Sequence, residues 1–527
     1  MINNPILKGF NPDPSIIRVG DDYYIATSTF EWFPGVQIHH SKDLVNWHLA
    51  ARPLNRVSQL DLRGDPDSGG VFAPCLTCHD GIFYLVYSDV KTRGSRFMDV
   101  HNYLVTTEDI LGEWSDPVYL NSTGFDPSLF HDEDGKKWLV SMRRDFRRGC
   151  GVMGGIVLQE YDPVYQKLTG PVHYLFHRGE LGEAEGPHIY KIKGYYYLIV
   201  AQGGTSYNHA VTLLRSKNVT GPYEMHPHNP VLTSKGDDTL LLQKAGHADL
   251  VETQAGEWYM VYLCARPVMP VKKCPLGRET AIQKVVFKED GWLYMENGTN
   301  RPEADVEAPD LEVCRWEDEV IRDDFDTDQL NIHYQSLRIP FAEEWISLTE
   351  RPGWLRIKGK ESLSSVFDQS LIARRQQAFK YQASTCVEFE PESFQQMAGL
   401  VCFYDTKNFH YLRISHDDVK GKVLGIISFN RNEMVYPMEE DIEMNELRSI
   451  HLRVEVDYEK LQFYYSPDEK EWIKVGPTLD ATILSDENPK LMGFTGAFVG
   501  LCCQDLLYNS KHADFDYFEY REDYVNE

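Results

Sequence analysis

The sequence has few cysteines and lacks any long run of apolar residues. Its ten cysteines among 527 residues show no regular spacing. This pattern argues against a disulfide framework and fits a reducing compartment such as the cytoplasm. No stretch of about 18 apolar residues is present, and the first residues lack the charged segment and apolar run of a signal peptide. We therefore expect a cytoplasmic protein without a membrane span.

Basic residues are also scarce. The chain has 53 Lys and Arg against 80 Asp and Glu, a formal net charge of −27. Its longest basic clusters are the pairs Arg143-Arg144 and Arg147-Arg148. So acidic a chain repels phosphate backbones and anionic membranes unless a basic patch compensates. We therefore expect neither a nucleic acid nor a membrane as a partner.

Aromatic residues are abundant, and many of them belong to a repeat. A turn followed by an aromatic-rich strand occurs five times at a spacing of roughly 60 residues. The copies begin at Asp21, Asp80, Asp134, Lys193 and Gly256. Each unit fits about four short antiparallel strands with Gly, Asn or Asp at the turns. Five such units without long helices between them predict a five-bladed β-propeller.

A second repeated position lies ten to twelve residues upstream of each aromatic strand, and it is occupied by Asp13, Phe72, Asp126, Glu185 and His247. Equivalent positions in the innermost strands of a propeller face the central channel, so these side chains are expected to meet around one axis. The Asp-Pro and Glu-Gly-Pro segments could instead be simple turns at the rim. Three carboxylates in matching register favour a functional site, because rigid turns hold their directions.

Three converging carboxylates either bind a hard cation or perform acid–base chemistry. The closely spaced Asp and Asn ligands of a calcium loop are absent. Acid–base catalysis needs one protonated and one ionised carboxyl, and a third carboxylate raises the pKa of the acid. Glycoside hydrolysis uses such a pair, and the inverting route leaves room for water between them. Candidates for a floor that stacks on the sugar are Phe30, Trp32, Phe33 and Phe72, although each of them taken alone is more often part of a blade core.

Seven motifs then follow in order along the chain: Asn11–Ser15, Ser28–Val36, Ser68–Pro74, Ser122–Phe130, Glu185–His188, Lys244–Ala248 and Pro275–Thr280. Together they resemble glycoside hydrolase family 43, and more closely its two-domain β-xylosidase branch. The resemblance continues through residues 494–500 and 513–518. It implies a five-bladed propeller and hydrolysis by single displacement with inversion.

The resemblance also implies individual roles. Asp13 is expected to be the general base, Glu185 the general acid, and Asp126 the group that orients Glu185 and raises its pKa. Arg278 is expected to point into the pocket, near Asp126 and the sugar hydroxyls, although an arginine taken alone is more often a surface or ion-pair residue. His247 resembles the channel histidine that in some members helps to hold a calcium ion through waters and in others only buttresses the site. No cofactor is required, and this calcium is the one metal that the resemblance allows.

Two features depart from the family pattern. Phe72 stands where branch members usually carry Trp, and its smaller ring covers less of a sugar. The segment 143–155 is basic and Gly-rich where an aromatic, polar loop is expected, so it is either a solvated loop or part of the pocket mouth. Both features leave the substrate preference open without affecting the acid–base assignment.

The blade motif ends near residue 300, where an acidic, Pro-bearing connector follows over 301–310. Alternating strands with regular turns then predict a lectin-like β-sandwich. We expect an all-β protein with the propeller over 1–305 and the sandwich over 320–527. In the β-xylosidase branch the sandwich packs on the propeller. Phe498 is accordingly expected to reach toward the pocket, which would close one side and favour exo-action.

The leading hypothesis is an exo-acting, inverting β-1,4-xylosidase that releases xylose from the non-reducing ends of xylo-oligosaccharides. The alternative within the family is an α-L-arabinofuranosidase or a bifunctional enzyme, since the two sugars present similar geometry near the cleaved bond. A non-catalytic carbohydrate-binding propeller is the alternative from another class. A homo-oligomer, either a dimer or a tetramer, is also expected. The expected substrate-binding residues are Phe30, Phe72, His247, Arg278 and Phe498.

Overall fold

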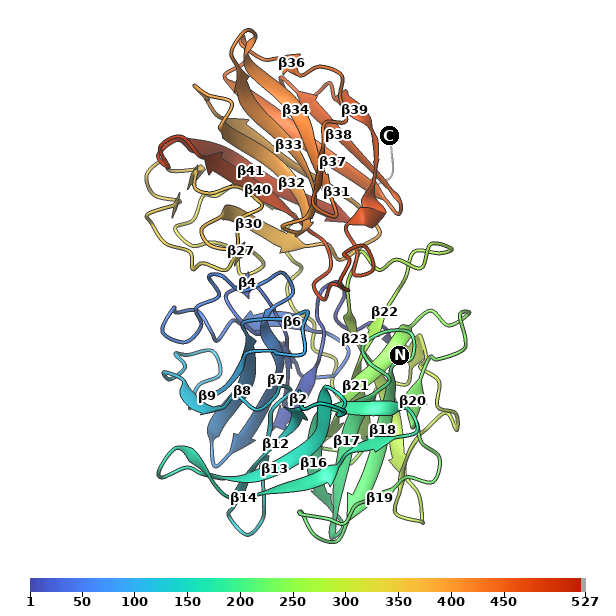
Figure 1. The fold of residues 1–527 in the computed structure, drawn as a ribbon. Coiled ribbons are helices and arrows are strands. Elements are labelled where there is room, and N and C mark those ends of the chain that lie inside the picture. Colours follow the sequence, from blue (N-terminus) through green and yellow to red (C-terminus); the bar gives the residue numbers. More distant parts are fainter. Residues whose placement is uncertain (523–527) are drawn as a thin grey trace.

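The computed structural model describes residues 1–522, and almost all of their regular structure is β-strand. The one helix in this range is a short 3-10 turn, η1 (Ala481–Ile483). Residues 1–522 thus include no helix long and apolar enough to cross a membrane. The strands gather in two bodies, one from the N-terminal part of the chain and one from the C-terminal part (Figure 1). The all-β fold class is confirmed.

The N-terminal body consists of five antiparallel sheets in which neighbouring strands follow one another along the chain. The first blade contains β2 (Ser15–Val19), β3 (Asp22–Thr27), β5 (Gln37–Ser41) and β6 (His48–Ala51), and the second β7 (Gly70–His79), β8 (Ile82–Val90), β9 (Val100–Thr107) and β10 (Val118–Asn121). The third contains β11 (Ser128–His131), β12 (Lys137–Arg144), β13 (Met153–Asp162) and β14 (Lys167–Phe176). The fourth contains β15 (Arg178–Gly179), β16 (Gly182–Ile192), β17 (Tyr195–Gln202), β18 (Ala210–Ser216), β19 (Glu224–Met225) and β20 (Leu232–Thr233). The fifth contains β21 (Gln243–Glu252), β22 (Trp258–Ala265), β23 (Glu279–Phe287) and β24 (Leu293–Met295).

The innermost strands form a closed ring. Around it, β2 contacts β7, β7 contacts β11, β11 contacts β16, β16 contacts β21, and β21 returns to β2. The start and the end of the propeller chain are also joined, because β1 (Ile2–Asn3) pairs with β25 (Asp305–Val306). The five repeats of the sequence are therefore the five blades of a propeller, as predicted.

The second strand of each blade carries the aromatic repeat. In β3 the alternate residues Tyr23 and Ile25 are fully buried, and in β8 Phe83 and Leu85 occupy the matching positions. This alternation follows from the two-residue period of a strand. The turn before β8 uses Gly81 at φ 76°, a left-handed conformation that glycine adopts without steric cost. Each blade thus buries its aromatic strand against the neighbouring blades.

The C-terminal body is a sandwich of two antiparallel sheets. One sheet contains β26 (Arg322–Asp323), β28 (Ile346–Ser347), β29 (Leu355–Lys358), β31 (Lys380–Glu388), β37 (Ser449–Asp457), β38 (Lys460–Ser466), β39 (Ile473–Asp480) and β41 (His512–Glu522). The other contains β27 (Gln335–Leu337), β30 (Ser370–Arg375), β32 (Gln396–Asp405), β33 (Asn408–Asp417), β34 (Gly421–Asn430), β35 (Glu433–Val435), β36 (Ile442–Glu443) and β40 (Phe498–Asp505). An apolar core fills the space between the sheets. The predicted β-sandwich is confirmed.

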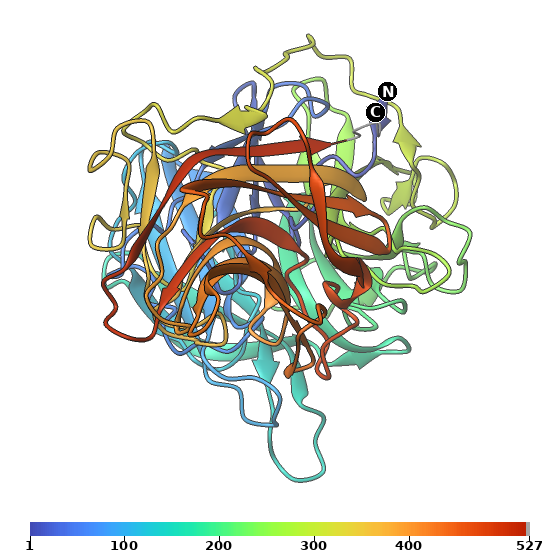
Figure 2. The ribbon, with the colours of Figure 1, turned by 90° about the horizontal axis from the view of Figure 1, so that it is seen from above.

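The two bodies share a sheet and a core. The short strand β4 (Trp32–Phe33) leaves the first blade and pairs with β27 at the edge of the second sandwich sheet. One apolar cluster includes Phe30 and Trp32 of the propeller together with Phe403 and Phe498 of the sandwich. From above, the sandwich lies over one face of the propeller (Figure 2). Residues of both bodies can therefore border a site on that face.

Candidate active site

Asp13 lies just before the inner strand of the first blade and is 6% exposed. Its φ of 55° is left-handed, a strained conformation for a residue with a side chain. Its Oδ2 accepts a hydrogen bond from Ser28 Oγ at 2.7 Å, and its Oδ1 accepts one from Arg278 Nη1 at 3.1 Å. Burial alone would raise the pKa of Asp13, but Arg278 and the Ser28 hydrogen bond together bring it below its ordinary value. Asp13 is therefore held as a carboxylate.

Asp126 occupies the same position before the inner strand of the third blade, with a φ of 53° and 6% exposure. Its Oδ2 accepts a hydrogen bond from the backbone N–H of Gly186 at 2.9 Å. Because Gly186 directly follows Glu185, this bond fixes the turn that carries Glu185. Burial, then the nearby Glu185 and Asp13, raise the pKa of Asp126 well above its ordinary value.

Glu185 lies in β16 at a β-bulge, since the pairing register with β17 shifts between Glu185 and His188. Burial first, and then the charge of Asp13, raise the pKa of Glu185 to about 7, although Arg278 acts in the opposite direction. The two carboxyls Asp13 and Glu185 are thus shifted in opposite directions. One is ionised over the whole neutral range and the other can hold a proton there.

Arg278 directly precedes β23 of the fifth blade and is 3% exposed. Besides its bond to Asp13, it donates to Thr205 Oγ1 at 3.1 Å and to the backbone oxygen of Phe494 at 3.3 Å. Its guanidinium lies over the rings of Phe30 and Phe494, 5.3 and 4.9 Å from their centroids. This one cation therefore connects the Asp13 carboxylate with aromatic rings of both bodies.

His247 lies at the same repeat position in the fifth blade, with its Nδ1 3.8 Å from Asp13 Oδ1. A Cβ added at Gly186 would stand 2.9 Å from the His247 ring, so the histidine packs against the turn beside Glu185. Burial lowers the pKa of His247 to about 4, and the imidazole is neutral at physiological pH. The contacts of His247, Asp13, Asp126 and Gly186 show that the repeat gathers these residues around one axis.

A metal ion was expected only as a calcium held near His247 through waters. Within residues 1–522, no group of three His, Cys, Asp or Glu side chains could hold a metal ion directly. A calcium at His247 would therefore depend on water ligands. Its presence stays a prediction, and no catalytic step below uses it.

Aromatic rings line one side of the carboxylate cluster. The rings of Phe30 and Phe72 meet edge to face with centroids 4.8 Å apart. Phe494 contacts both rings, at 5.6 Å and 5.9 Å. The backbone N–H of Ala73, next to Phe72, donates to the same Ser28 Oγ that bonds Asp13. Phe30 and Phe72 thus lie where the sequence places them, beside the base candidate.

The structure differs from the expectation at Phe498. This residue is 0% exposed, and its ring stacks on Trp32 with centroids 3.7 Å apart and contacts Phe10. It is the first residue of β40, where strand alternation directs it into the core shared by the two bodies. Phe494, four residues earlier and outside the strand, is the sandwich aromatic that contacts Arg278. Phe494 and Ser28 both belong to segments singled out in the sequence, but nothing in those segments indicated their contacts.

The segment 143–155 also borders this face of the propeller. The N–H of Arg144 donates to the backbone oxygen of Thr123, close to Asp126 in the chain. A Cβ added at Gly151 would stand 2.3 Å from a carboxylate oxygen of Glu183, two residues before Glu185. Of the two alternatives from the sequence, the contacts favour a segment beside the site over one that is merely solvated.

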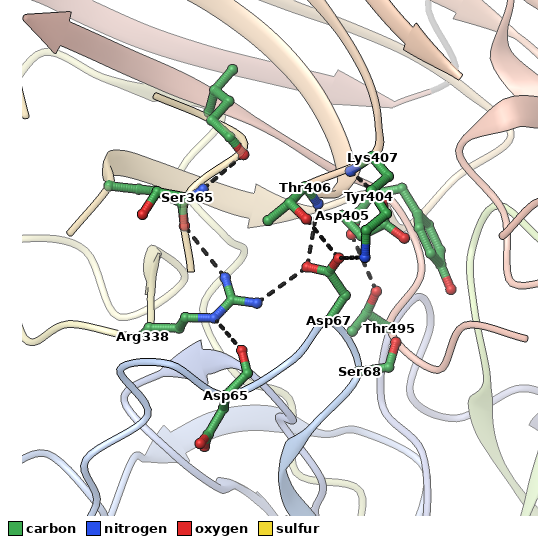
Figure 3. Close-up of polar contacts among 12 residues, drawn as sticks. Asp65, Asp67, Ser68, Arg338, Ser365, Tyr404, Asp405, Thr406, Lys407 and Thr495 are labelled. Carbon is green, nitrogen blue, oxygen red and sulfur yellow. Dashed lines mark hydrogen bonds and ion pairs between the residues drawn. The ribbon is translucent and has the colours of Figure 1, made fainter. Parts of the chain in front are cut away.

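An ion-pair network anchors the sandwich over the site. Asp67, in the loop before β7, pairs with Arg338 at 3.1 Å and accepts hydrogen bonds from Thr406 and Lys407 (Figure 3). Its neighbour Ser68 accepts a hydrogen bond through Oγ from the backbone N–H of Phe494 at 3.0 Å. The position of Phe494 beside Arg278 is thus fixed from the propeller side.

Residues 2–293 match the family model described as glycosyl hydrolases family 43, and residues 322–521 match the β-xylosidase C-terminal Concanavalin A-like domain. The chain belongs to glycoside hydrolase family 43. The two-domain resemblance inferred from the sequence is therefore confirmed.

Three relatives of this family 43 enzyme are similar over almost their whole length. A β-xylosidase of Bacillus subtilis is 50% identical over 99% of both chains. A xylosidase/arabinosidase 43B of Humicola insolens is 49% identical over 99% of this chain and 97% of the relative. The crystal structure of a xylan β-1,4-xylosidase from Bacillus halodurans C-125 superposes with a TM-score of 0.98 at 54% identity, covering 99% of this chain and 100% of that one.

Proposed function

We propose that this family 43 enzyme is an exo-acting β-1,4-xylosidase that releases xylose from the non-reducing ends of xylo-oligosaccharides. The observation that carries the proposal is a pair of carboxyls with opposite pKa shifts, one buried (Asp13) and one half-buried (Glu185). The pKa of Asp13 lies below its ordinary value, and the pKa of Glu185 is raised to about 7. When the pKa values of two carboxyls are shifted in opposite directions, the one with the lower pKa can act as the base and the one with the higher pKa as the acid.

In the proposed reaction, Glu185 donates its proton to the glycosidic oxygen while the bond from that oxygen to the anomeric carbon breaks. Asp13 takes a proton from a water molecule, whose oxygen forms the new bond to the anomeric carbon from the opposite face. Water is thereby split between the two products, and a β-xyloside yields α-xylose. Arg278 and Ser28 hold Asp13, and Asp126 positions Glu185 through the N–H of Gly186.

The choice of a xyloside rests on two further observations. All three relatives described above have xylosidase in their names. Phe30, Phe72 and Phe494 form an apolar wall that suits the C–H face of a pyranose, a ring stacking that aromatic residues commonly provide. The sandwich that supplies Phe494 covers one side of the site, which favours removal of single sugars from chain ends.

An α-L-arabinofuranosidase activity is the second candidate. The Humicola insolens relative, 49% identical, is named for both xylosidase and arabinosidase activity. The same acid–base pair serves either sugar, because the chemistry at the anomeric carbon is shared. A bifunctional enzyme is therefore the form in which this candidate is proposed.

Parallel assays with nitrophenyl β-xyloside and nitrophenyl α-L-arabinofuranoside test the proposal, with Glu185→Gln as the inactive control. Turnover of the xyloside, with α-xylose appearing first in proton NMR, is the expected result. Initial β-xylose would contradict the inverting route. Turnover of neither substrate would favour the non-catalytic carbohydrate-binding propeller instead.

The expected homo-oligomer, dimer or tetramer, is proposed on the sequence alone, and light scattering on the purified chain measures it. The cytoplasmic location likewise stays a prediction, which fractionation of the source cells checks.

Treatment with a chelator before assay tests the calcium at His247. Unchanged activity after chelation would argue that the histidine only buttresses the site.

A further inference from the structure

A loop of the sandwich, residues 484–497 between η1 and β40, packs on the propeller beside Arg278. Its partner in the propeller is the turn formed by residues 274–277, which directly precedes Arg278. The turn is closed by a hydrogen bond from the N–H of Gly277 to the backbone oxygen of Cys274 at 3.1 Å. We call the two segments the sandwich loop and the arginine turn.

The backbones of the sandwich loop and the arginine turn are in direct contact. The backbone oxygen of Pro275 accepts a hydrogen bond from the N–H of Ala497 at 2.7 Å. A Cβ added at Gly277 would stand 2.7 Å from the backbone oxygen of Thr495. Since there is no room between the two segments, the arginine turn cannot move unless the sandwich loop moves with it.

Glu487 adds two side-chain contacts from the sandwich loop. Its Oε2 accepts a hydrogen bond at 2.8 Å from the N–H of Cys274, the first residue of the arginine turn. Its Oε1 pairs with Lys244 Nζ at 2.5 Å. Lys244 belongs to β21 and lies three residues before His247. One carboxylate of the sandwich therefore joins the two propeller segments that carry Arg278 and His247.

The ion pair of Lys244 with Glu487 lies in a largely buried place. The side chain of Lys244 is 1% exposed and that of Glu487 is 21% exposed. Burial opposes the charge of the lysine, but the groups around it, Cys274, Asp486 and Glu487, raise its pKa above the ordinary value. Asp486 is itself engaged, because its Oδ1 accepts a hydrogen bond from Tyr404 at 2.8 Å. Removing Glu487 would thus leave a buried ammonium without its direct partner, which is unfavourable.

The arginine turn matters because it decides where the Arg278 guanidinium lies. Arg278 bonds Asp13 Oδ1 at 3.1 Å and the backbone oxygen of Phe494, in the sandwich loop, at 3.3 Å. Its Nε is buried without a hydrogen-bond partner among residues 1–522, so side-chain contacts hold only the end of the fork. A misplacement of about 1 Å near a reacting centre can cost about a hundredfold in rate. The contacts of the turn with the sandwich therefore bear on the rate.

We propose that Glu487 is a positioning residue of the proposed hydrolysis. It fixes the arginine turn to the sandwich and thereby holds Arg278 against Asp13. The sandwich then contributes to the reaction itself, in addition to covering one side of the site. The inference rests on the proposed function, because it assigns Glu487 to the reaction that Asp13 and Glu185 perform.

Steady-state kinetics of Glu487→Gln on nitrophenyl β-xyloside give the first test. Glutamine keeps the size and one accepting oxygen but loses the charge that pairs with Lys244. We expect kcat/KM to fall by roughly tenfold at a temperature where circular dichroism shows the variant to be folded. The control Glu392→Gln removes the carboxylate of a sandwich ion pair with Lys511, before the start of β32, whereas the sandwich loop contacts the end of that strand at Tyr404. Equal kcat/KM in Glu487→Gln, the control and the unaltered enzyme would overturn the inference.

A double-mutant cycle with Arg278→Lys separates positioning from a purely structural role. If Glu487 acts through Arg278, the loss caused by Glu487→Gln shrinks to within about twofold in the Arg278→Lys background. If Glu487 only stabilises the fold, the two losses multiply, and that result would overturn the inference. Glu487→Asp, which keeps the charge but is one methylene shorter, takes the place of Glu487→Gln if the latter does not fold.

The same assays distinguish this inference from the proposed function. Turnover of the xyloside by the unaltered enzyme is measured in parallel, and its absence would contradict the proposed function itself. Losses that multiply in active proteins would contradict only the role of Glu487.

Discussion

Two groups of largely buried acids in this enzyme are arranged in opposite ways. At the interface, Asp67 pairs with Arg338 and accepts hydrogen bonds from Thr406 and Lys407. These partners lower the pKa of Asp67 by more than burial raises it. In the channel, burial raises the pKa of both Asp126 and Glu185. Glu185 and Asp13 add to the shift of Asp126, and Asp13 adds to that of Glu185.

The difference shows how one fold separates stability from chemistry. Carboxylates that hold the two bodies together are supplied with donors, so their charge is stable at neutral pH. The two channel carboxyls with a raised pKa, Asp126 and Glu185, have no ion pair within residues 1–522, since Arg278 bonds only Asp13 among the three. Removing a partner should therefore destabilise the interface, whereas removing a carboxyl from the channel should alter the rate and its pH dependence.

The largest expected effect follows from removing either member of the acid–base pair. Asp13→Asn and Glu185→Gln each eliminate one proton-transfer partner, and such partners contribute typically about 10²–10⁴-fold to the rate. We expect kcat on the nitrophenyl xyloside to fall by that factor or more, while circular dichroism and Tm stay close to those of the unaltered enzyme. Near-normal turnover in either variant would remove that residue from the mechanism.

The interface network gives the next largest effect. Arg338→Met would leave Asp67 largely buried beside a neutral side chain, and breaking a buried ion pair from one side typically costs about 3–5 kcal/mol. Urea unfolding should show a clear fall in the midpoint. The exposed pair between Arg63 and Asp61 provides the control, since Arg63→Met is expected to cost no more than about 1 kcal/mol. Equal losses in both variants would contradict the role given to Arg338.

Glu31 shares features of both groups. It is buried near the interface network, yet its pKa is raised like those of Asp126 and Glu185. It is 1% exposed, and neither of its carboxylate oxygens has a hydrogen-bond partner among residues 1–522. Burial, and then the charge of Asp67, raise its pKa from 4.5 to about 7 against the attraction of Arg338. The folded state therefore holds the Glu31 proton more tightly than the unfolded chain does.

A carboxyl with a raised pKa makes the folded state less stable as the pH rises from about 4.5 through 7. With about 1.4 kcal/mol for each pKa unit, the loss approaches about 3 kcal/mol. Glu31→Gln removes this titration, so its stability relative to the unaltered enzyme should increase between pH 5 and pH 8. Denaturant midpoints at both pH values measure the change, with the exposed Glu113→Gln as control. Parallel curves for all three proteins would contradict the pKa assigned to Glu31.

The sequence was sufficient to predict the propeller and the gathering of its channel residues. The aromatic strand and the position before each inner strand repeat with every blade, so a local pattern specifies where Asp13, Asp126 and His247 lie around the axis. The opposite pKa shifts of Asp13 and Glu185 depend on Arg278, 265 residues away from Asp13, and no repeat relates Arg278 to the carboxylates.

The contacts between the two bodies could not be predicted in the same way. Asp67 and Thr406 are 339 residues apart and belong to different folds. Phe494 and Phe498 lie in one short segment, and only the start of β40 at Phe498 decides which ring is directed into the core. The pairing of β4 with β27 likewise depends on how a blade loop meets a sheet edge. Each of these features arises from packing between two independently patterned domains.

The smallest expected effect concerns Asp126, which transfers no proton itself. Asp126 Oδ2 accepts a hydrogen bond from the N–H of Gly186, and the carboxyls of Asp126 and Glu185 lie close enough to interact. Asp126→Asn keeps the size and an accepting oxygen but removes the charge. The proton of Glu185 is then held less tightly, so the alkaline limb of the kcat profile should move to lower pH.

The acidic limb, which reports Asp13, should move less, because Arg278 and Ser28 bind that carboxylate directly. Because Asp126 and Glu185 titrate as a pair, the limb is a property of both groups and only its direction is expected. The plateau rate should fall by roughly tenfold through poorer positioning of Glu185. Asp126→Ala, which also removes the accepting oxygen, should lower the plateau further while moving the limb in the same direction. An alkaline limb that stays in place or moves upward in Asp126→Asn would show that Asp126 acts only through the Gly186 turn.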